Sequence, residues 1–194
     1  VLNILCSALS LALFSAQEKT SIGSIPIDQR AARHVLWRLA FTGLLGIGYE
    51  VLVVRVLSQV LEDTVYTFAI LLAVYLVGSA LGAAGYQRWL AKSRDPRNLI
   101  DQLLCVLAGM CILGAASLWG AEQVKDLALH TFGTDMTAAL SAEAMLALIA
   151  FGPPTIVMGA LFSHLSASAR GVGVSFGRAL GFNTLGAAAA PLIC

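Results

Sequence analysis

Long apolar runs alternate with short polar segments along all 194 residues of the chain. A helix needs about 20 mainly apolar residues to cross the hydrocarbon core of a bilayer, and backbone groups in lipid must be hydrogen-bonded internally, which favours helices. Six runs reach or approach that length. They cover residues 1–16, 35–61, 65–86, 99–120, 138–169 and 179–194. The pattern predicts an all-α fold, a polytopic transmembrane helix bundle of about six spans, whose first and last spans are truncated.

The composition agrees with this pattern. Hydrophobic residues make up 58% of the chain and charged residues 12%, whereas a soluble domain carries about 25% charged residues. The mean hydropathy is +0.83. The net charge of +1 does not indicate a nucleic-acid partner, and we expect none. The lipid bilayer is the expected surrounding of the chain.

Lysine and arginine gather in three alternate loops, residues 17–34, 87–97 and 170–178. The side chains concerned are Lys19, Arg30, Arg33, Arg88, Lys92, Arg94, Arg97, Arg170 and Arg178. The intervening loops are mainly acidic. Basic residues concentrate in the short loops on the cytoplasmic side of a membrane. We therefore expect a multi-pass protein of the cell membrane in which these three loops are cytoplasmic. Both chain ends then lie on the other side.

Small residues line one face of the span over 65–86. Gly78, Gly82 and Gly85 follow one another at intervals of four and three residues, among several alanines. Such small-xxx-small faces let two helix backbones approach closely in a membrane. We therefore predict helix packing through these glycines. A sliding interface in a transporter is the alternative.

Glu50 is the deepest charged residue of the predicted spans, and Arg55 follows it in the same run. Ionisable groups inside a membrane are costly and therefore candidates for function. Five residues correspond to roughly 140° around a helix, so these two do not form an i,i+4 pair. Each is expected to find a partner on another helix, or Arg55 extends to the interface. A structural polar anchor and a proton or substrate site both remain open for Glu50.

Three further features of the last two spans carry polar or backbone groups. His164 has neighbouring serines and is expected to be a hydrogen-bonded packing residue. Asn183 is expected to bond across helices. The pair Pro153 and Pro154 should free backbone carbonyl groups, which either line a cavity or shape the bundle.

The sequence contains no recognisable catalytic, metal or cofactor motif. No second His or Cys lies at ligand spacing from His164. The glycines of residues 171–177 have one residue too many for a dinucleotide fingerprint and follow no strand. We predict no catalytic residue, no metal and no cofactor in this segment, and whether the protein is an enzyme stays open.

Several stretches resemble the membrane domain of spermidine synthase-like proteins, which is major-facilitator-like. They are residues 48–61, 64–82, 154–162 and 177–187, in the order and spacing of that family. The resemblance departs at Val54, where the family often has Trp, and at Ser163 or His164, where it often has Pro. It implies that residues 1–16 are the last span of a preceding repeat, 17–34 a cytoplasmic linker and 35–194 a membrane repeat, in a segment of a longer protein.

The resemblance leaves three functions to be compared. The first is a membrane scaffold or accessory subunit that packs against a membrane protein partner or further repeats of the same polypeptide, or anchors a soluble domain. The second is the membrane part of a polyamine aminopropyltransferase-type enzyme. Enzymatic members of the family carry a soluble Rossmann-like domain for that reaction, which is absent from these 194 residues. The third is a major-facilitator-like transporter, with a path lined by Glu50, Arg55 and the proline-containing span.

Overall fold

The computed structural model describes residues 29–60, 65–92, 96–121, 123, 126–127 and 136–193. Five long helices and one short π-helical turn account for nearly all of this part, and it contains no strand. The elements are α2 (Gln29–Val60), α3 (Val65–Gly85), η1 (Tyr86–Leu90), α4 (Pro96–Leu118), α6 (Met136–Gly171) and α7 (Phe176–Ile193). The all-α prediction is confirmed for the described residues.

Four segments are long and apolar enough to cross a membrane. They are Gln29–Ser58, Tyr66–Leu90, Asn98–Leu118 and Glu143–Gly171, and they match four of the six predicted spans. The counterpart of the last predicted span, α7, has 18 residues and falls outside this group because Arg178, Asn183 and Thr184 lower its apolar content. The first predicted span, 1–16, lies outside the described residues, as do residues 17–28. Thus four spans are supported where the sequence predicts six.

The first described helix begins earlier than predicted. It starts at Gln29, inside the predicted linker of residues 17–34. Residues 29–33 include two alanines and two arginines, which are good helix formers, so the helix continues beyond its apolar part. The helix α6 also continues without interruption through Pro153 and Pro154.

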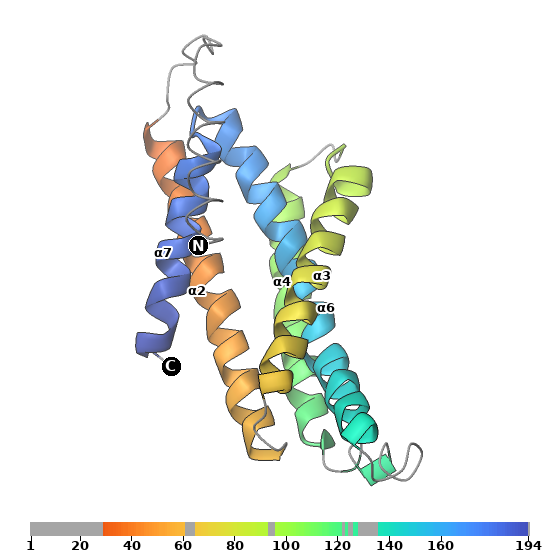
Figure 1. The fold of residues 1–194 in the computed structure, drawn as a ribbon. Coiled ribbons are helices and arrows are strands. Elements are labelled where there is room, and N and C mark those ends of the chain that lie inside the picture. The colour runs from red at the N-terminus through yellow and green to blue at the C-terminus, as the bar shows by residue number, and fades with distance from the viewer. Residues whose placement is uncertain are drawn as a thin grey trace, which may run out of the picture.

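The helices form two parallel pairs. α2 packs along α7 and α3 packs along α6, while α4 packs against α6. Figure 1 shows that α2 and α7 run in one direction and that α3 and α6 run in the opposite direction. α2 also contacts α6, which joins the two pairs. The start of α2, η1 and the α6–α7 connection lie at the same end of the bundle (Figure 1).

Glycine brings the backbones of α3 and α6 into direct contact. A Cβ atom added at Gly82 would overlap the carbonyl oxygen of Ile156, and one added at Gly159 would overlap the carbonyl oxygen of Ser79. On each helix, the glycine therefore follows by three residues the carbonyl that the other helix contacts. No side chain, however small, fits at either glycine without separating the two helices.

The pair of α2 and α7 repeats this arrangement. A Cβ atom at Gly43 would overlap the carbonyl oxygen of Asn183, and one at Gly186 would overlap that of Ala40. The spacing of three residues between the carbonyl and the glycine is the same as in α3 and α6. We refer to these four close approaches as the glycine contacts. They give the two oppositely directed pairs the same packing unit.

The three glycines predicted to pack helices lie in two different surroundings. Gly78 lies against the side chain of Thr155 on α6, next to the contact of Gly82. At Gly85, an added Cβ would meet only the Trp89 ring, at 3.5 Å. Gly85 therefore faces its own chain segment, and its predicted role in helix packing does not hold. The physical reason is that crossing helices diverge away from their point of closest approach.

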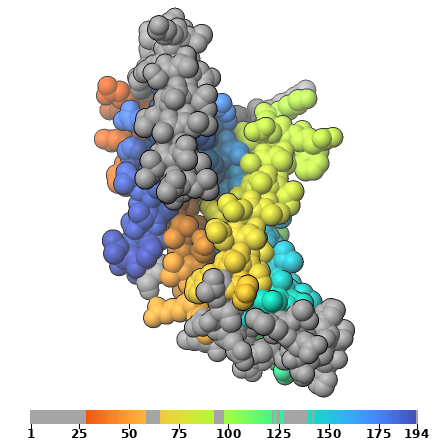
Figure 2. Space-filling view, in the orientation of Figure 1, coloured from red at the N-terminus to blue at the C-terminus, as the bar shows by residue number. Residues whose placement is uncertain are grey.

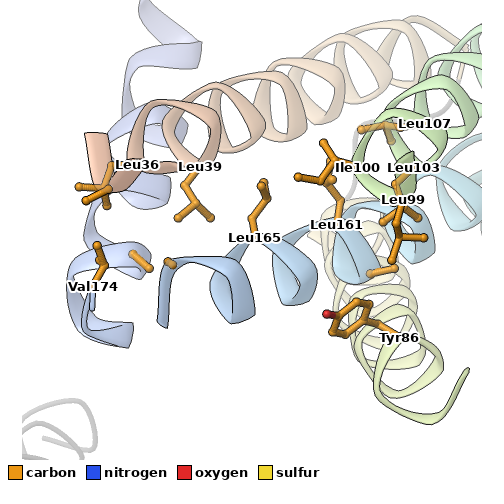
Figure 3. Close-up of a cluster of buried hydrophobic side chains, with 14 residues drawn as sticks. Leu36, Leu39, Tyr86, Leu99, Ile100, Leu103, Leu107, Leu161, Leu165 and Val174 are labelled. Carbon is orange, nitrogen blue, oxygen red and sulfur yellow. The ribbon is translucent and has the colours of Figure 1, made fainter. Parts of the chain in front are cut away.

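Two clusters of buried apolar side chains fill the ends of the bundle. The first joins α2, α4, α6, η1 and the α6–α7 connection, and Figure 3 shows leucines of α2, α4 and α6 together with Tyr86 of η1 and Val174 of the connection. It contains Leu36, Leu39, Tyr86, Leu99, Ile100, Leu103, Leu107, Leu161, Leu165 and Val174. The second joins α2, α3 and α6 around Phe151. Because lipid tails are as apolar as these side chains, van der Waals contact is what favours such packing in a membrane.

Large apolar side chains remain exposed on the outer surfaces of the helices. Examples are Leu45, Leu52, Leu72, Leu76, Leu81, Ile112 and Leu113, each more than half exposed. On the face drawn in Figure 2, α2 lies between α7 and α3. A surface of this kind is unfavourable in water and suits lipid or an apolar partner.

Candidate functional site

A cavity of about 370 Å³ lies between the two helix pairs. Its walls come from α2 and α7 on one side and from α3 and α6 on the other, with one residue of α4. Gly43 and Gly159, which make two of the glycine contacts, belong to the wall. Two of the backbone contacts that hold the helices of each pair together therefore lie in the wall of the cavity itself. None of its lining side chains among the described residues is acidic or basic.

Asn183 is the only one of the four predicted polar site residues that lines this cavity. Its side-chain oxygen lies 3.5 Å from the hydroxyl oxygen of Thr42 on α2, which is long for a hydrogen bond between oxygen and a hydroxyl. The Thr42 hydroxyl donates a shorter bond of 2.9 Å to the carbonyl of Leu39. Asn183 thus faces the neighbouring helix, as expected, but through a weak contact that leaves its amide available.

The proline pair of α6 leaves one carbonyl group that Tyr49 of α2 satisfies. Proline has no N–H, so Pro154 cannot donate to the carbonyl oxygen of Ala150, its partner in a regular helix. The hydroxyl group of Tyr49 donates to this oxygen over 2.8 Å. Gly114 of α4 makes room for both groups, since a Cβ there would overlap both oxygen atoms. The Ala150 carbonyl therefore shapes the bundle and does not face the cavity.

The Tyr49 ring also belongs to an aromatic stack. Phe151 is fully buried and has Tyr49 and Tyr75 as neighbours, with ring centroids 5.9 and 6.2 Å away and interplanar angles of 22° and 23°. Offset-stacked aromatic pairs at such distances add stability beyond their buried area. The stack joins α2 and α3 to α6 directly beside the two prolines.

His164 is buried against Tyr86. It is 4% exposed, its Nδ1 atom lies 3.2 Å from the Tyr86 hydroxyl, and the two rings meet edge to face with centroids 5.4 Å apart. Both residues border a smaller cavity of about 220 Å³ together with Leu99 and Ser168. This arrangement is that of a hydrogen-bonded packing residue, the interpretation that the sequence favours.

The buried carboxylate among the described residues is that of Glu143, whereas the sequence pattern singles out Glu50. Glu143 of α6 is 6% exposed, and the hydroxyl group of Thr67 on α3 donates to its Oε2 atom over 2.9 Å. A carboxylate buried among apolar side chains is costly unless it accepts hydrogen bonds. The Thr67 hydroxyl therefore stabilises Glu143 and ties α3 to α6 near the start of the latter.

Glu50 and Arg55 do not meet in the structure. Glu50 is partly buried and Arg55 is exposed on α2. Neither side chain forms a hydrogen bond or ion pair with the described residues, and neither lines the cavity. Neither residue therefore has a partner on another helix within the described part of the chain, and the alternative for Arg55, extension to the interface, stays a prediction.

The sequence prediction missed Tyr49, Thr67, Tyr86 and Glu143 as members of polar contacts. Glu143 carries a signal, since it is a carboxylate in an apolar run. The two tyrosines and Thr67 carry none, because their hydroxyl groups matter only through residues that are distant along the chain, such as Ala150 and His164.

No group of three His, Cys, Asp or Glu side chains that could hold a metal ion occurs in the described ranges. Comparison of the chain with protein-family models, curated proteins and solved structures found no match.

Proposed function

We propose that this chain is a membrane scaffold or accessory subunit related to spermidine synthase-like membrane proteins. In this proposal its helices pack against a partner membrane protein or hold a soluble domain at the membrane. The observation that carries the proposal is the set of glycine contacts. Backbones in direct contact in both helix pairs make a stiff module, which is what a scaffold requires.

The polar groups support the same proposal. The contacts of Glu143 with Thr67, His164 with Tyr86 and Tyr49 with Ala150 all lie inside the bundle. The outer surfaces of α2, α3 and α4 carry large apolar side chains. The outer surfaces are therefore available to lipid and partners, while the interior polar groups hold the helices together. We propose further that the end with η1 and the α6–α7 connection is cytoplasmic, from its basic residues.

Site-specific photocrosslinking in the native membrane tests the scaffold. A photoreactive amino acid replaces one exposed leucine at a time, at Leu45 on α2, Leu76 on α3 and Leu113 on α4, each more than half exposed. A scaffold gives a discrete protein adduct from one helix face and lipid adducts from the others. Lipid adducts from every position on all three helices would contradict packing against a membrane partner and leave the anchoring of a soluble domain.

The cavity favours transport as a second candidate. A transporter would move its substrate through an opening between the two helix pairs, where the cavity lies. Reconstitution into liposomes with labelled spermidine separates the two functions. Flux that is lost in an Asn183→Leu variant, whose altered side chain lines the cavity, with unchanged assembly would replace the scaffold by a transporter.

A further inference from the structure

The cavity between the helix pairs offers hydrogen-bonding groups that the protein itself does not use. The polar side chains in its lining are those of Thr42, Tyr75, Ser79, Ser163, Asn183 and Thr184. The hydroxyl groups of Thr42 and Thr184 donate to carbonyl groups of their own helices. The hydroxyl groups of Ser79 and Ser163 form no hydrogen bond with the described residues, and the Asn183 amide has only the 3.5 Å contact. Serine in a helix commonly bonds back to a carbonyl of the preceding turn, as Ser168 does to His164.

These groups are held in place by the backbone. Two of the glycine contacts involve the backbones of these residues. The carbonyl oxygen of Ser79 meets Gly159, and the carbonyl oxygen of Asn183 meets Gly43. Their Cα positions are therefore fixed while their side chains point to the cavity wall. Groups that are positioned before a ligand binds lose little freedom when it does, which favours binding.

The remaining lining defines the chemistry of the ligand. Apolar side chains such as Met158, Phe162 and Leu180 surround the polar groups, and no acidic or basic side chain of the described residues lies among them. A charged molecule would lose its hydration without gaining a counter-charge. A neutral molecule with hydroxyl or ester oxygens and an apolar tail would satisfy both kinds of surface.

We infer that this cavity is a binding site for an uncharged, hydroxyl-bearing lipid of the glyceride or long-chain alcohol class. The head group accepts and donates hydrogen bonds at Ser79, Ser163 and Asn183, and the apolar tail leaves the cavity between the helix pairs. A volume of about 370 Å³ lies within the range of about 300–1,000 Å³ that is usual for small-molecule sites. This site does not depend on the scaffold proposal.

The test uses two photoreactive probes of equal chain length on the purified chain in lipid nanodiscs. One probe is a diazirine-bearing monoacylglycerol and the other a diazirine-bearing alkylammonium. We expect the monoacylglycerol to label the cavity segments of α2, α3, α6 and α7, and an excess of unlabelled monoacylglycerol to suppress this labelling. Equal labelling by the ammonium probe, or labelling without competition on the exposed faces, would overturn the inference.

Two matched variants on α3 locate the probe. Ala83 lines the cavity, whereas its neighbour Ala84 is exposed and does not. Ala83→Phe fills the cavity and should lower the competable labelling by about tenfold, which corresponds to about 1.4 kcal/mol of binding free energy. Ala84→Phe should leave it unchanged. Equal effects of the two variants would contradict a site in the cavity.

A second pair of variants keeps the test decisive if Ala83→Phe fails to fold. The double variant Ser79→Ala and Ser163→Ala removes two hydroxyl groups from the cavity without adding volume. The control is Ser58→Ala with Ser117→Ala, whose hydroxyl groups bond to their own helices away from the cavity. Labelling should fall by about fivefold or more in the cavity variant only. Unchanged labelling there would refute recognition through these hydroxyl groups.

Discussion

The hydroxyl group of Tyr49 donates a hydrogen bond of 2.8 Å to the carbonyl oxygen of Ala150, the acceptor that Pro154 leaves without its helical donor. A side chain of α2 thus replaces a missing backbone group of α6. This contact and the aromatic stack around Phe151 hold the proline-containing part of α6 against its neighbours.

Tyr49→Phe should therefore destabilise the bundle while keeping the aromatic stack. We expect a loss of about 1 kcal/mol, the net value of one hydrogen bond, and up to about 3 kcal/mol if the Ala150 carbonyl finds no other donor. Unfolding by titration with SDS in mixed micelles measures it. Tyr66→Phe is the control, because Tyr66 is an exposed tyrosine of α3. An equal midpoint for both variants would show that the hydrogen bond carries no stability.

Two glycines of α7 give a direct test of the glycine contacts. At Gly186 a methyl group would overlap the carbonyl of Ala40, whereas at Gly181 it would meet nothing within 4 Å. Gly186→Ala should cost about 1–3 kcal/mol, as overpacking does. Gly181→Ala should change stability by less than about 0.5 kcal/mol. The same unfolding measurement distinguishes them, and two equally stable variants would argue against close contact between α2 and α7.

The contact between Thr67 and Glu143 should appear as a coupling energy. Thr67→Val removes the donor and leaves the buried carboxylate with one bond fewer, at a cost of about 1–3 kcal/mol. In a Glu143→Gln background the same change should cost less, because the neutral amide needs the donor less. A double-mutant cycle of the four proteins measures the difference. Additive effects would mean that the two side chains do not interact.

The charges of Glu50 and Arg55 should contribute little to folding. Arg55 is exposed, and Glu50 is partly buried without a hydrogen-bond partner among the described residues. Arg55→Gln should therefore change the unfolding free energy by less than about 0.5 kcal/mol. Glu50→Gln should not lower it, because a neutral amide is easier to bury than a carboxylate. A large loss in Glu50→Gln would instead indicate a structural anchor.

The sequence predicts the helices better than their contacts. Long apolar runs identify α2, α3, α4 and α6, because the length of such a run is set by the bilayer. The ends are less certain, as Gln29 shows, since charged helix formers extend a helix without adding to its apolar run. The helix α7 is a separate case, because its apolar content is low. Its polar residues fall in a short helix and weaken the signal of a span.

The candidate site is harder to predict for a physical reason. Gly82 and Gly85 look alike in the sequence, but only Gly82 lies at the closest approach of α3 and α6. Likewise, Ser79 and Ser163 are ordinary serines until two helices bring them to one cavity. Charge draws attention to Glu50, whereas the cavity consists of neutral groups. The geometry of helix crossing decides these matters, and no short stretch of sequence contains it.

The glycine contacts also determine how the bundle can move. Within each pair the two backbones touch, and in the pair of α2 and α7 sliding by one turn would bring Leu39 or Ile47 to the place of Gly43, against the backbone of α7. Between the pairs the contact is softer, since Gly46 of α2 meets the flexible thioether of Met158 at 3.5 Å. The bundle therefore behaves as two stiff bodies joined by a compliant seam. Its lowest-energy deformation changes the width of that seam and leaves the register of α2 against α7 intact.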